Sequence, residues 1–403
     1  MTRFRLPLLL ATALPGIASA ATLLVGPGLA YSRPCEALTK AQSFDTVEID
    51  GTQTYRGDVC RITASNLTIK GVRGRPKIDA GGKNADGKGT WVITGNDVTV
   101  DNVEMFGSAV SDRNGAAIRV EGNNFTLRNS FLHDNENGVL TGASPTSRLV
   151  MEFNEFGHNG NGDGYSHNVY VGQVASLVFR HNYSHDAHIG HNLKSRAQIN
   201  MVAYNRFSSL NKGETGSTAA GKPSYEIDIS NGGNAYIIGN VIQQPAEHSN
   251  SNMLAYGLEA PGKPGDKLYV INNTFINDAH AGTFVLIGDK VTAAALLQNN
   301  FFSGKGNITN QQRATQVTNY QGTEADFVNR AVYDLHPNDN RRVINAGAEP
   351  PKLESGISLV PTRQYKHVAA GEPRPVIGAL DVGAYQTVIV QESKKPWYNI
   401  LKN

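Results

Sequence analysis

The sequence predicts a solenoid of stacked β-coils. A short unit recurs along the chain, made of an alternating strand that ends in Asn, one further residue, and Phe or Ile. Apolar residues within the unit recur at every second position, which is the spacing of a strand rather than a helix. Glycine is frequent, at 42 of 403 residues. A unit of roughly two dozen residues cannot bury its own apolar face, whereas stacked units bury a continuous column.

The copies of the unit place Asn at the same point of the pattern. They are Asn129 with Phe131, Asn154 with Phe156, Asn205 with Phe207, Asn240 with Ile242, Asn273 with Phe275 and Asn300 with Phe302, and Asn102 and Asn182 fit with altered neighbours. Asn at one corner of every coil can hydrogen-bond along the stack and tolerates left-handed backbone angles. A loop and a second strand follow each corner, as at 117–120 and 168–171.

The first residues have the pattern of a signal peptide. Arg3 and Arg5 precede the apolar run 6–14, and Ala18-Ser19-Ala20 is a small-residue cleavage site. The run is too short to span a bilayer. We therefore expect residues 1–20 to be removed after Ala20, a single solenoid domain over 21–386, a tail of unassigned structure over 387–403, and a secreted or periplasmic protein without a membrane span.

Cys35 and Cys60 are the only cysteines, and in an oxidising compartment they should form a disulfide. A metal pair or a catalytic thiol is disfavoured because neither cysteine has a His, a Cys or a base at suitable spacing. The net charge is +2, and no basic run is interleaved with aromatic residues, so we expect no nucleic-acid partner. We expect a monomer.

The repeated pattern resembles right-handed parallel β-helix proteins, and the resemblance covers nearly the whole mature chain. In that class a helix caps the first coil. The stretch 32–41, with Ser32 before Pro34, has the start signals of such a helix. The stretches 343–347 and 377–385 resemble terminal coils of this class.

The second strand of each coil would line the substrate groove, as the resemblance implies. The apolar residues Ile118, Val139, Val169, Leu193 and Ile227 align in one inward column. With a period of two, the residues on either side of each anchor should face outward. Three adjacent coils would then present Asn168, Tyr170 and Gly172, next Asn192, Lys194 and Arg196, and next Glu226, Asp228 and Ser230, with Arg119 on an earlier coil.

This group of side chains favours chemistry on a uronic-acid polysaccharide, by β-elimination or C5 epimerisation. Both reactions need a base beside a carboxylate, neutralisation of that carboxylate, and an acid. Lys194 and Arg196 suit the base and the neutraliser, and Tyr170 or His191 suits the acid. The stretch 192–207 resembles the Lys-Ser coil of chondroitinase B and its alginate lyase relatives. Asp163, His167 and the His-rich coil that follows are similar to bacterial mannuronan C5-epimerases.

The next coil lacks the catalytic Arg of those lyases, and it offers Glu226 and Asp228 instead, which could hold Ca²⁺ for the substrate carboxylate. No other cofactor is expected. We expect Asn168, Asn192, Glu226, Asp228 and Arg119 to bind substrate. The spacing of His185, His188 and His191 suggests zinc, but on a loop it fixes no single face.

Two further functions are open on this sequence. Glu226 and Asp228 could place two carboxyls about 6.5–7 Å apart, near the inverting range of a glycoside hydrolase. The groove could instead grip a polysaccharide without turnover, as in an adhesin. In that case Lys194 and Asp228 would form only an ion pair between coils, worth about 0–1 kcal/mol.

Overall fold

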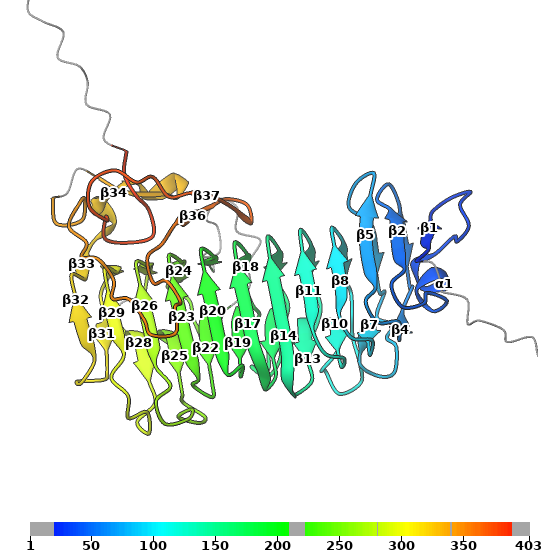
Figure 1. Cartoon of the computed structure of the whole chain (residues 1–403), viewed down its shortest axis with the longest axis horizontal. Coiled ribbons are helices and arrows are strands. Elements are labelled where there is room, and N and C mark those ends of the chain that lie inside the picture. Colours follow the sequence, from blue (N-terminus) through cyan, green and yellow to red (C-terminus); the bar gives the residue numbers. More distant parts are fainter. Residues whose placement is uncertain (1–19, 209–221, 280, 339–340, 389–403) are drawn as a thin grey trace, which may run out of the picture.

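The computed structural model describes residues 20–208, 222–279, 281–338 and 341–388. Three long, all-parallel sheets run side by side along the molecule, so the fold is the predicted parallel β-helix (Figure 1). The expected signal peptide, apart from Ala20, and residues 389–403 lie outside the described residues. Within the described part, no helix is long and apolar enough to cross a membrane.

The three sheets are named A, B and C. Sheet A contains β1 (Thr22–Val25), β2 (Thr46–Asp50), β5 (Thr68–Val72), β8 (Val98–Asp101), β11 (Phe125–Arg128), β14 (Ser144–Glu152), β17 (Val174–Arg180), β20 (Ile199–Ala203), β23 (Asn234–Ile238), β26 (Leu268–Ile271), β29 (Leu296–Gln298) and β32 (Thr315–Val317). Sheet B contains β3 (Thr54–Arg56), β6 (Lys77–Asp79), β9 (Glu104–Phe106), β12 (Phe131–His133), β15 (Glu155–Gly157), β18 (Tyr183–His185), β21 (Arg206–Ser208), β24 (Val241–Gln244), β27 (Thr274–Asn277), β30 (Phe301–Gly304) and β33 (Tyr320–Gly322). Sheet C contains β4 (Cys60–Ile62), β7 (Gly89–Ile93), β10 (Ala116–Val120), β13 (Asn137–Thr141), β16 (Val169–Val171), β19 (Leu193–Ser195), β22 (Ile227–Ile229), β25 (Asn252–Tyr256), β28 (Thr283–Ile287) and β31 (Asn307–Thr309).

The corner between sheets A and B carries a buried Asn ladder. Asn205 Nδ2 donates to Asn240 Oδ1 at 2.9 Å and to the Phe179 carbonyl at 2.8 Å. The same bond joins each neighbouring pair of the ladder, which consists of Asn154, Asn182, Asn205, Asn240, Asn273, Asn300 and Asn319. Every amide of the ladder thereby satisfies polar groups inside the stack, where an unsatisfied group is costly.

Two of the sequence copies are aligned one residue too early. Ser130, not Asn129, occupies the ladder position, because its backbone N–H donates to Asn154 Oδ1 at 3.1 Å. Leu132, not Phe131, pairs with Phe156 and enters the core. Asn102 is shifted in the same way, since the pairing of Glu104 with Phe131 puts Asn102 in register with Asn129 rather than with the ladder. Asn102 and Asn129 instead take the left-handed corner position, with φ of 58° and 52°.

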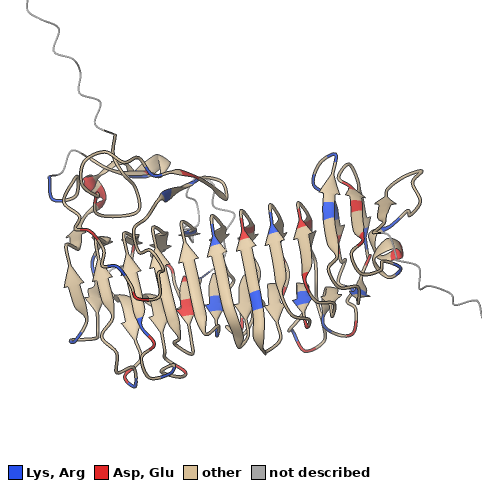
Figure 2. Cartoon of the chain, in the orientation of Figure 1, with Lys and Arg blue, Asp and Glu red and all other residues tan. Residues whose placement is uncertain are grey.

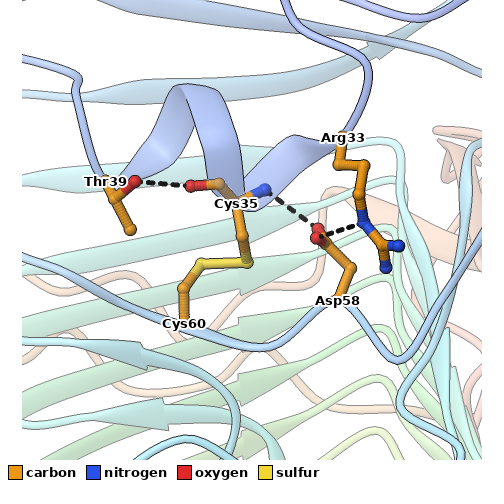
Figure 3. Close-up of a disulfide and its surroundings, with 5 residues drawn as sticks. All are labelled: Arg33, Cys35, Thr39, Asp58 and Cys60. Carbon is orange, nitrogen blue, oxygen red and sulfur yellow. Dashed lines mark hydrogen bonds and ion pairs between the residues drawn. A yellow bond between two sulfur atoms is a disulfide. The ribbon is translucent and has the colours of Figure 1, made fainter.

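A short helix and a disulfide close the first coil. Helix α1 (Pro34–Leu38) buries Ala37 and Leu38 against the core, and it is shorter than the predicted 32–41. The predicted disulfide between Cys35 and Cys60 is confirmed and joins α1 to β4 (Figure 3). Asp58 accepts a hydrogen bond from the Cys35 backbone N–H at 2.9 Å, which fixes the helix start to the same coil.

Sheet A carries a ladder of alternating charge on its outer face. Successive partners are Glu48, Lys70, Asp101, Arg128, Glu152 and Arg180. Figure 2 shows the alternation as red and blue bands along these strands. Opposite charges directly across a sheet stabilise it, and like charges would destabilise it. This column is therefore an example of a charge ladder with a purely structural role.

The chain after β33 leaves the stack and folds back beside sheet B (Figure 1). This segment contains η1 (Glu324–Asp326), β34 (Phe327–Asn329), η2 (Arg330–Val332), β35 (Asp334–Pro337), β36 (Arg363–Lys366) and β37 (Ala370–Pro373). The expectation of terminal coils at 343–347 and 377–385 is wrong, because neither stretch joins a sheet. They bond to each other, as in Val382 N–H to the Val343 carbonyl at 2.8 Å, and they bury Val343, Val382 and Ala384 in a cluster with Phe301.

Candidate active site

The register of sheet C places Tyr170, Lys194 and Asp228 in one column. Tyr170 pairs with Lys194, and Lys194 pairs with Asp228, on the strands β16, β19 and β22. The inward anchors Val169, Leu193 and Ile227 are fully buried. The period-two alternation therefore turns the three reactive side chains to the outer face, as the sequence predicts.

Lys194 lies between two carboxylates. Its Nζ is 2.8 Å from Glu259 Oε1 and 3.5 Å from Asp228 Oδ2, and its side chain is 13% exposed. The ammonium also lies 5.7 Å from the centre of the Tyr170 ring. Lys194 is therefore enclosed by two carboxylates and an aromatic face, the surroundings that pair with a cation.

Arg196 links the column to the loop that carries Glu259. Its Nε donates to the Tyr170 hydroxyl at 2.8 Å, and its terminal nitrogens contact Asn231 and Glu259, each at 2.5 Å. Burial lowers the pKa of Arg196, but the bonds to Tyr170 and Glu259 outweigh it and raise the pKa. Arg196 is therefore a fixed cation whose donors form a fork around Tyr170 and Glu259.

Two stacked imidazoles, His167 and His191, lie beside the column. Their ring centres are 4.5 Å apart. His167 Nδ1 accepts from the His191 backbone N–H at 3.0 Å, and His191 Nδ1 accepts from the Tyr225 backbone N–H at 3.2 Å. An accepting Nδ1 leaves the ring proton on Nε2. His191 Nε2 in turn lies 3.6 Å from Asp228 Oδ2.

Both rings are held neutral by their surroundings. Burial, followed by the charge of Lys194, lowers the pKa of His191 to about 3. Burial and the neighbouring His191 hold the pKa of His167 well below its usual value. A neutral His191 with its proton on Nε2 is a hydrogen-bond donor that faces the column, while His167 supports its ring.

Asp228 is a buried carboxylate at the end of the column. Burial raises its pKa, although a 2.6 Å hydrogen bond from the Ser230 hydroxyl and the charge of Lys194 act in the opposite sense. Its Oδ1 is buried without a hydrogen-bond partner among the described residues. Groups perturbed in this way by burial and a charge partner are typical of functional sites.

Three residues predicted to bind substrate point inward instead. Asn168, Asn192 and Glu226 are 0% exposed. They form a second interior ladder at the corner before sheet C, where Asn168 Nδ2 donates to Asn192 Oδ1 at 2.8 Å and Asn192 Nδ2 donates to Glu226 Oε2. Each residue precedes its strand, so the outward alternation does not yet apply. The carboxylate pair suggested for Ca²⁺ and for hydrolysis is thereby split, with Glu226 inside and Asp228 on the outer face.

Arg119 lies in the same column as Tyr170 but two coils away. It pairs with Leu140, which pairs with Tyr170. Its guanidinium bonds to Glu121 at 2.7 Å, and Lys88 bonds to the same carboxylate. Arg119 therefore lies along the outer face that leads to the site, without contacting the group at Lys194.

The sequence prediction missed Glu259, Asn231 and Tyr225, which complete the site. Each comes from a loop or a strand entrance rather than from the aligned strand positions. Glu259 follows β25 and is held by backbone N–H to the Ser230 carbonyl at 3.0 Å. The loop lengths vary from coil to coil, so no period in the sequence marks such a residue.

The comparisons with known proteins agree with the fold. No family model and no curated protein sequence matches the chain. The crystal structure of pectate lyase Pel9A matches with a TM-score of 0.60 and 15% identity, over 92% of this chain and 97% of that chain. The chain has the fold of that lyase. A second structure, Geobacillus virus E2 ORF18, overlaps with a TM-score of 0.40 and 12% identity, over 71% of this chain and 56% of that chain.

Proposed function

We propose that the protein is an extracytoplasmic enzyme that removes the C5 proton of a uronic-acid residue in a polysaccharide, leading to β-elimination or epimerisation. The observation that carries the proposal is the Tyr170–Lys194–Asp228 column with Arg196 bonded to the Tyr170 hydroxyl. The disulfide between Cys35 and Cys60 supports the extracytoplasmic location, because such bonds persist in oxidising compartments. The pectate-lyase fold is compatible with this chemistry.

The substrate carboxylate would take the place of the Glu259 carboxylate. Glu259 bridges Lys194 Nζ and Arg196 in the resting site, at 2.8 and 2.5 Å. A uronate carboxylate bound between the same two cations would have its charge neutralised, which acidifies the C5 proton beside it. In this proposal Lys194 serves as a neutraliser rather than as the base suggested by its sequence context, because it already pairs with the carboxylates of Glu259 and Asp228.

Tyr170 is the proposed proton-transfer group, and His191 is the proposed hydrogen-bond donor to the developing charge. Arg196 donates to Tyr170, and a hydrogen bond from a guanidinium stabilises the phenolate while the proton moves. His191, whose single ring proton is on Nε2, keeps that proton and donates a hydrogen bond to the charge that develops on the substrate. In elimination Tyr170 returns the abstracted proton to the leaving oxygen, and in epimerisation solvent water supplies a proton to the opposite face of C5. His167 is a positioning residue, because it holds His191 by stacking and by the bond to its backbone.

A purely structural role for the column is the main competing explanation. The ladder on sheet A alternates in sign over six residues, and its members pair on both sides. On sheet C, Leu140 precedes Tyr170 and Ala255 follows Asp228, so no charge ladder continues. Two cations, two carboxylates and two buried imidazoles gathered at one point of the column favour a reactive site over a stabilising pair.

The test is incubation with a panel of uronic-acid polymers, with ultraviolet absorbance read for unsaturated uronates and NMR read for changed C5 configuration. Lys194→Ala and Tyr170→Phe should each lower turnover by at least about 100-fold, the range of a lost acid–base or charge-stabilising group. Lys70→Ala is the matched control, because Lys70 makes a similar 2.9 Å pair with Glu48 on sheet A. New reducing ends without either signal would indicate hydrolysis, and binding that is unaltered in Lys194→Ala would indicate a scaffold.

A further inference from the structure

A second candidate site lies on sheet B, away from the column on sheet C. The C-terminal segment covers the outer face of this sheet and leaves a cavity of about 870 Å³. Figure 1 shows β36 and β37 lying beside the ends of β18 and β24. The cavity is lined by titratable residues from both sides, among them His158, His185, Arg206, His336, His367 and Glu372.

Three potential metal ligands lie close together on sheet B, and two of them, His158 and His185, line this cavity. One ligand atom from each of His158, His185 and Asp186 lies within 4.8 Å of the other two. His185 ends β18, while His158 follows β15 on the preceding coil, so the β-helix register brings them together. The ring centres of His158 and His185 are 5.3 Å apart.

Gly157 makes this approach possible. Gly157 pairs with His185 across the two coils, and a Cβ at Gly157 would lie 2.6 Å from the His185 ring. The imidazole of His185 therefore occupies space that any other residue at position 157 would fill. His133, one coil earlier, stacks on Phe106 and Phe131 instead of joining the group.

The two nitrogens of His185 have different partners. Nδ1 lies 2.8 Å from Asp186 Oδ2, and Nε2 lies 3.3 Å from Glu155 Oε1. With an ion bound at Nδ1, the Nε2–H would donate to Glu155, which is the usual carboxylate support of a metal-bound histidine. Asp186 is 1% exposed and His185 is 7% exposed, so the ligands are held by the fold rather than by solvent.

We propose that His158, His185 and Asp186 bind one divalent first-row transition metal ion, with zinc as the representative ion. Two imidazoles and one carboxylate suit zinc and its neighbours, whereas Ca²⁺ and Mg²⁺ take oxygen ligands. Metal–nitrogen bonds of about 2.0–2.1 Å place the ligand atoms of a tetrahedral site about 3.3 Å apart. The separations of up to 4.8 Å would therefore have to shorten, and the 2.8 Å contact between His185 Nδ1 and Asp186 Oδ2 would have to open. Three protein ligands leave a fourth coordination position for a further ligand.

Arg206, which lines the same cavity as His158 and His185, suggests the charge of that further ligand. Its side chain is 6% exposed and packs against the rings of Tyr183 and Tyr333, at 5.3 and 4.1 Å. Its Nη1 lies 3.4 Å from His367 Nδ1, its Nε is buried without a hydrogen-bond partner, and it forms no ion pair with a carboxylate among the described residues. A buried cation without a counter-charge is unfavourable. An anionic oxygen ligand, such as a carboxylate, would satisfy both the metal and Arg206.

The test is the metal content of the purified, metal-stripped chain after incubation with Zn²⁺ or Co²⁺ and removal of free ion. We expect one ion per chain, a visible Co²⁺ absorption band, and a metal-dependent rise in Tm. His158→Ala and the nearly isosteric Asp186→Asn should each lower metal affinity at least 10-fold. His336→Ala is the matched control, since His336 forms a lone 2.7 Å pair with Asp334 in the same cavity.

Two results would overturn the proposal. One is a folded wild-type chain that retains no stoichiometric metal. The other is a folded Asp186→Asn variant, checked by circular dichroism, that keeps full metal affinity. Lys194→Ala should bind metal like the wild type. The result for metal binding is therefore independent of the result for turnover at the sheet C site.

Discussion

Substitution of Glu259 by Gln should separate the resting site from the substrate-bound site. The Glu259 carboxylate bridges the two cations that the proposed mechanism assigns to the substrate, and it is 46% exposed. Two partly exposed ion pairs are worth up to about 1 kcal/mol each. A substrate carboxylate that no longer has to displace them gains about 1–2 kcal/mol of binding free energy, which corresponds to a roughly 5- to 30-fold lower Kd.

The assay is equilibrium binding of a uronate oligosaccharide to Glu259→Gln in a Tyr170→Phe background, with KM and kcat measured in the Tyr170 parent. We expect a lower Kd and KM, an unchanged kcat, and a free energy of unfolding that changes by less than about 1 kcal/mol. Glu48→Gln, which removes a Lys-paired carboxylate from sheet A, should change none of these. An unchanged or higher Kd together with a lower kcat would refute the reasoning, because Glu259 would then hold Lys194 and Arg196 in their working positions.

Three further predictions concern the fold and its pH dependence. Asn205→Ala removes two hydrogen bonds that the side chain donates and two that it accepts. The free energy of unfolding in urea should therefore fall by about 4 kcal/mol, and a loss below about 1 kcal/mol would contradict the proposed role of the ladder. Replacing Cys35 and Cys60 by Ala opens a disulfide with a sequence separation of 25, which should cost about 3 kcal/mol in the same assay, whereas an unchanged midpoint would mean that the first coil needs no cross-link. Because the pKa of His191 is about 3 in the folded chain, the unfolded chain binds a proton that the folded chain does not, and stability should fall as pH drops below 6.5. His191→Asn should remove about 1.4 kcal/mol per pH unit of that slope between about pH 6 and 4, and an identical slope would contradict the assignment. The raised pKa of Asp228, which lies 3.6 Å from His191, acts in the opposite sense.

The coil register could be predicted because it rests on local, periodic features. The apolar anchors and the corner Asn recur with the strands, so Lys194 could be placed between Tyr170 and Asp228 from the sequence. The register predicted from the sequence is one residue off where two apolar residues are adjacent. Phe131 and Leu132 both fit the core position, and the structure chooses Leu132.

The alternation of side chains along a strand could not predict that Asn168, Asn192 and Glu226 point into the interior. These residues lie at a corner, where the backbone is not yet part of the pleated strand, so their side chains do not follow a period of two. Their hydrogen bonds to one another along the stack decide their direction.

Contacts between coils, rather than spacing along one coil, decide how the histidines are grouped. His185 and His191 are separated by a multiple of three, which suggested a shared site. The structure places His185 with His158 of the preceding coil and His191 with His167. The cavity beside His185 also needs the C-terminal segment, whose return along sheet B leaves no repeat in the sequence.

Deuterium incorporation at C5 is the measurement that tests the proposed chemistry most directly, because elimination and epimerisation share the removal of that proton. The wild-type chain would be incubated in D₂O with each uronic-acid polymer, and the C5 signal would be followed by NMR together with the absorbance of unsaturated ends. The account predicts exchange or unsaturation with at least one polymer, and its loss in Tyr170→Phe and Lys194→Ala but not in Lys70→Ala. Polymers that bind at the sheet C site and keep every C5 proton, with no unsaturated ends, would contradict it.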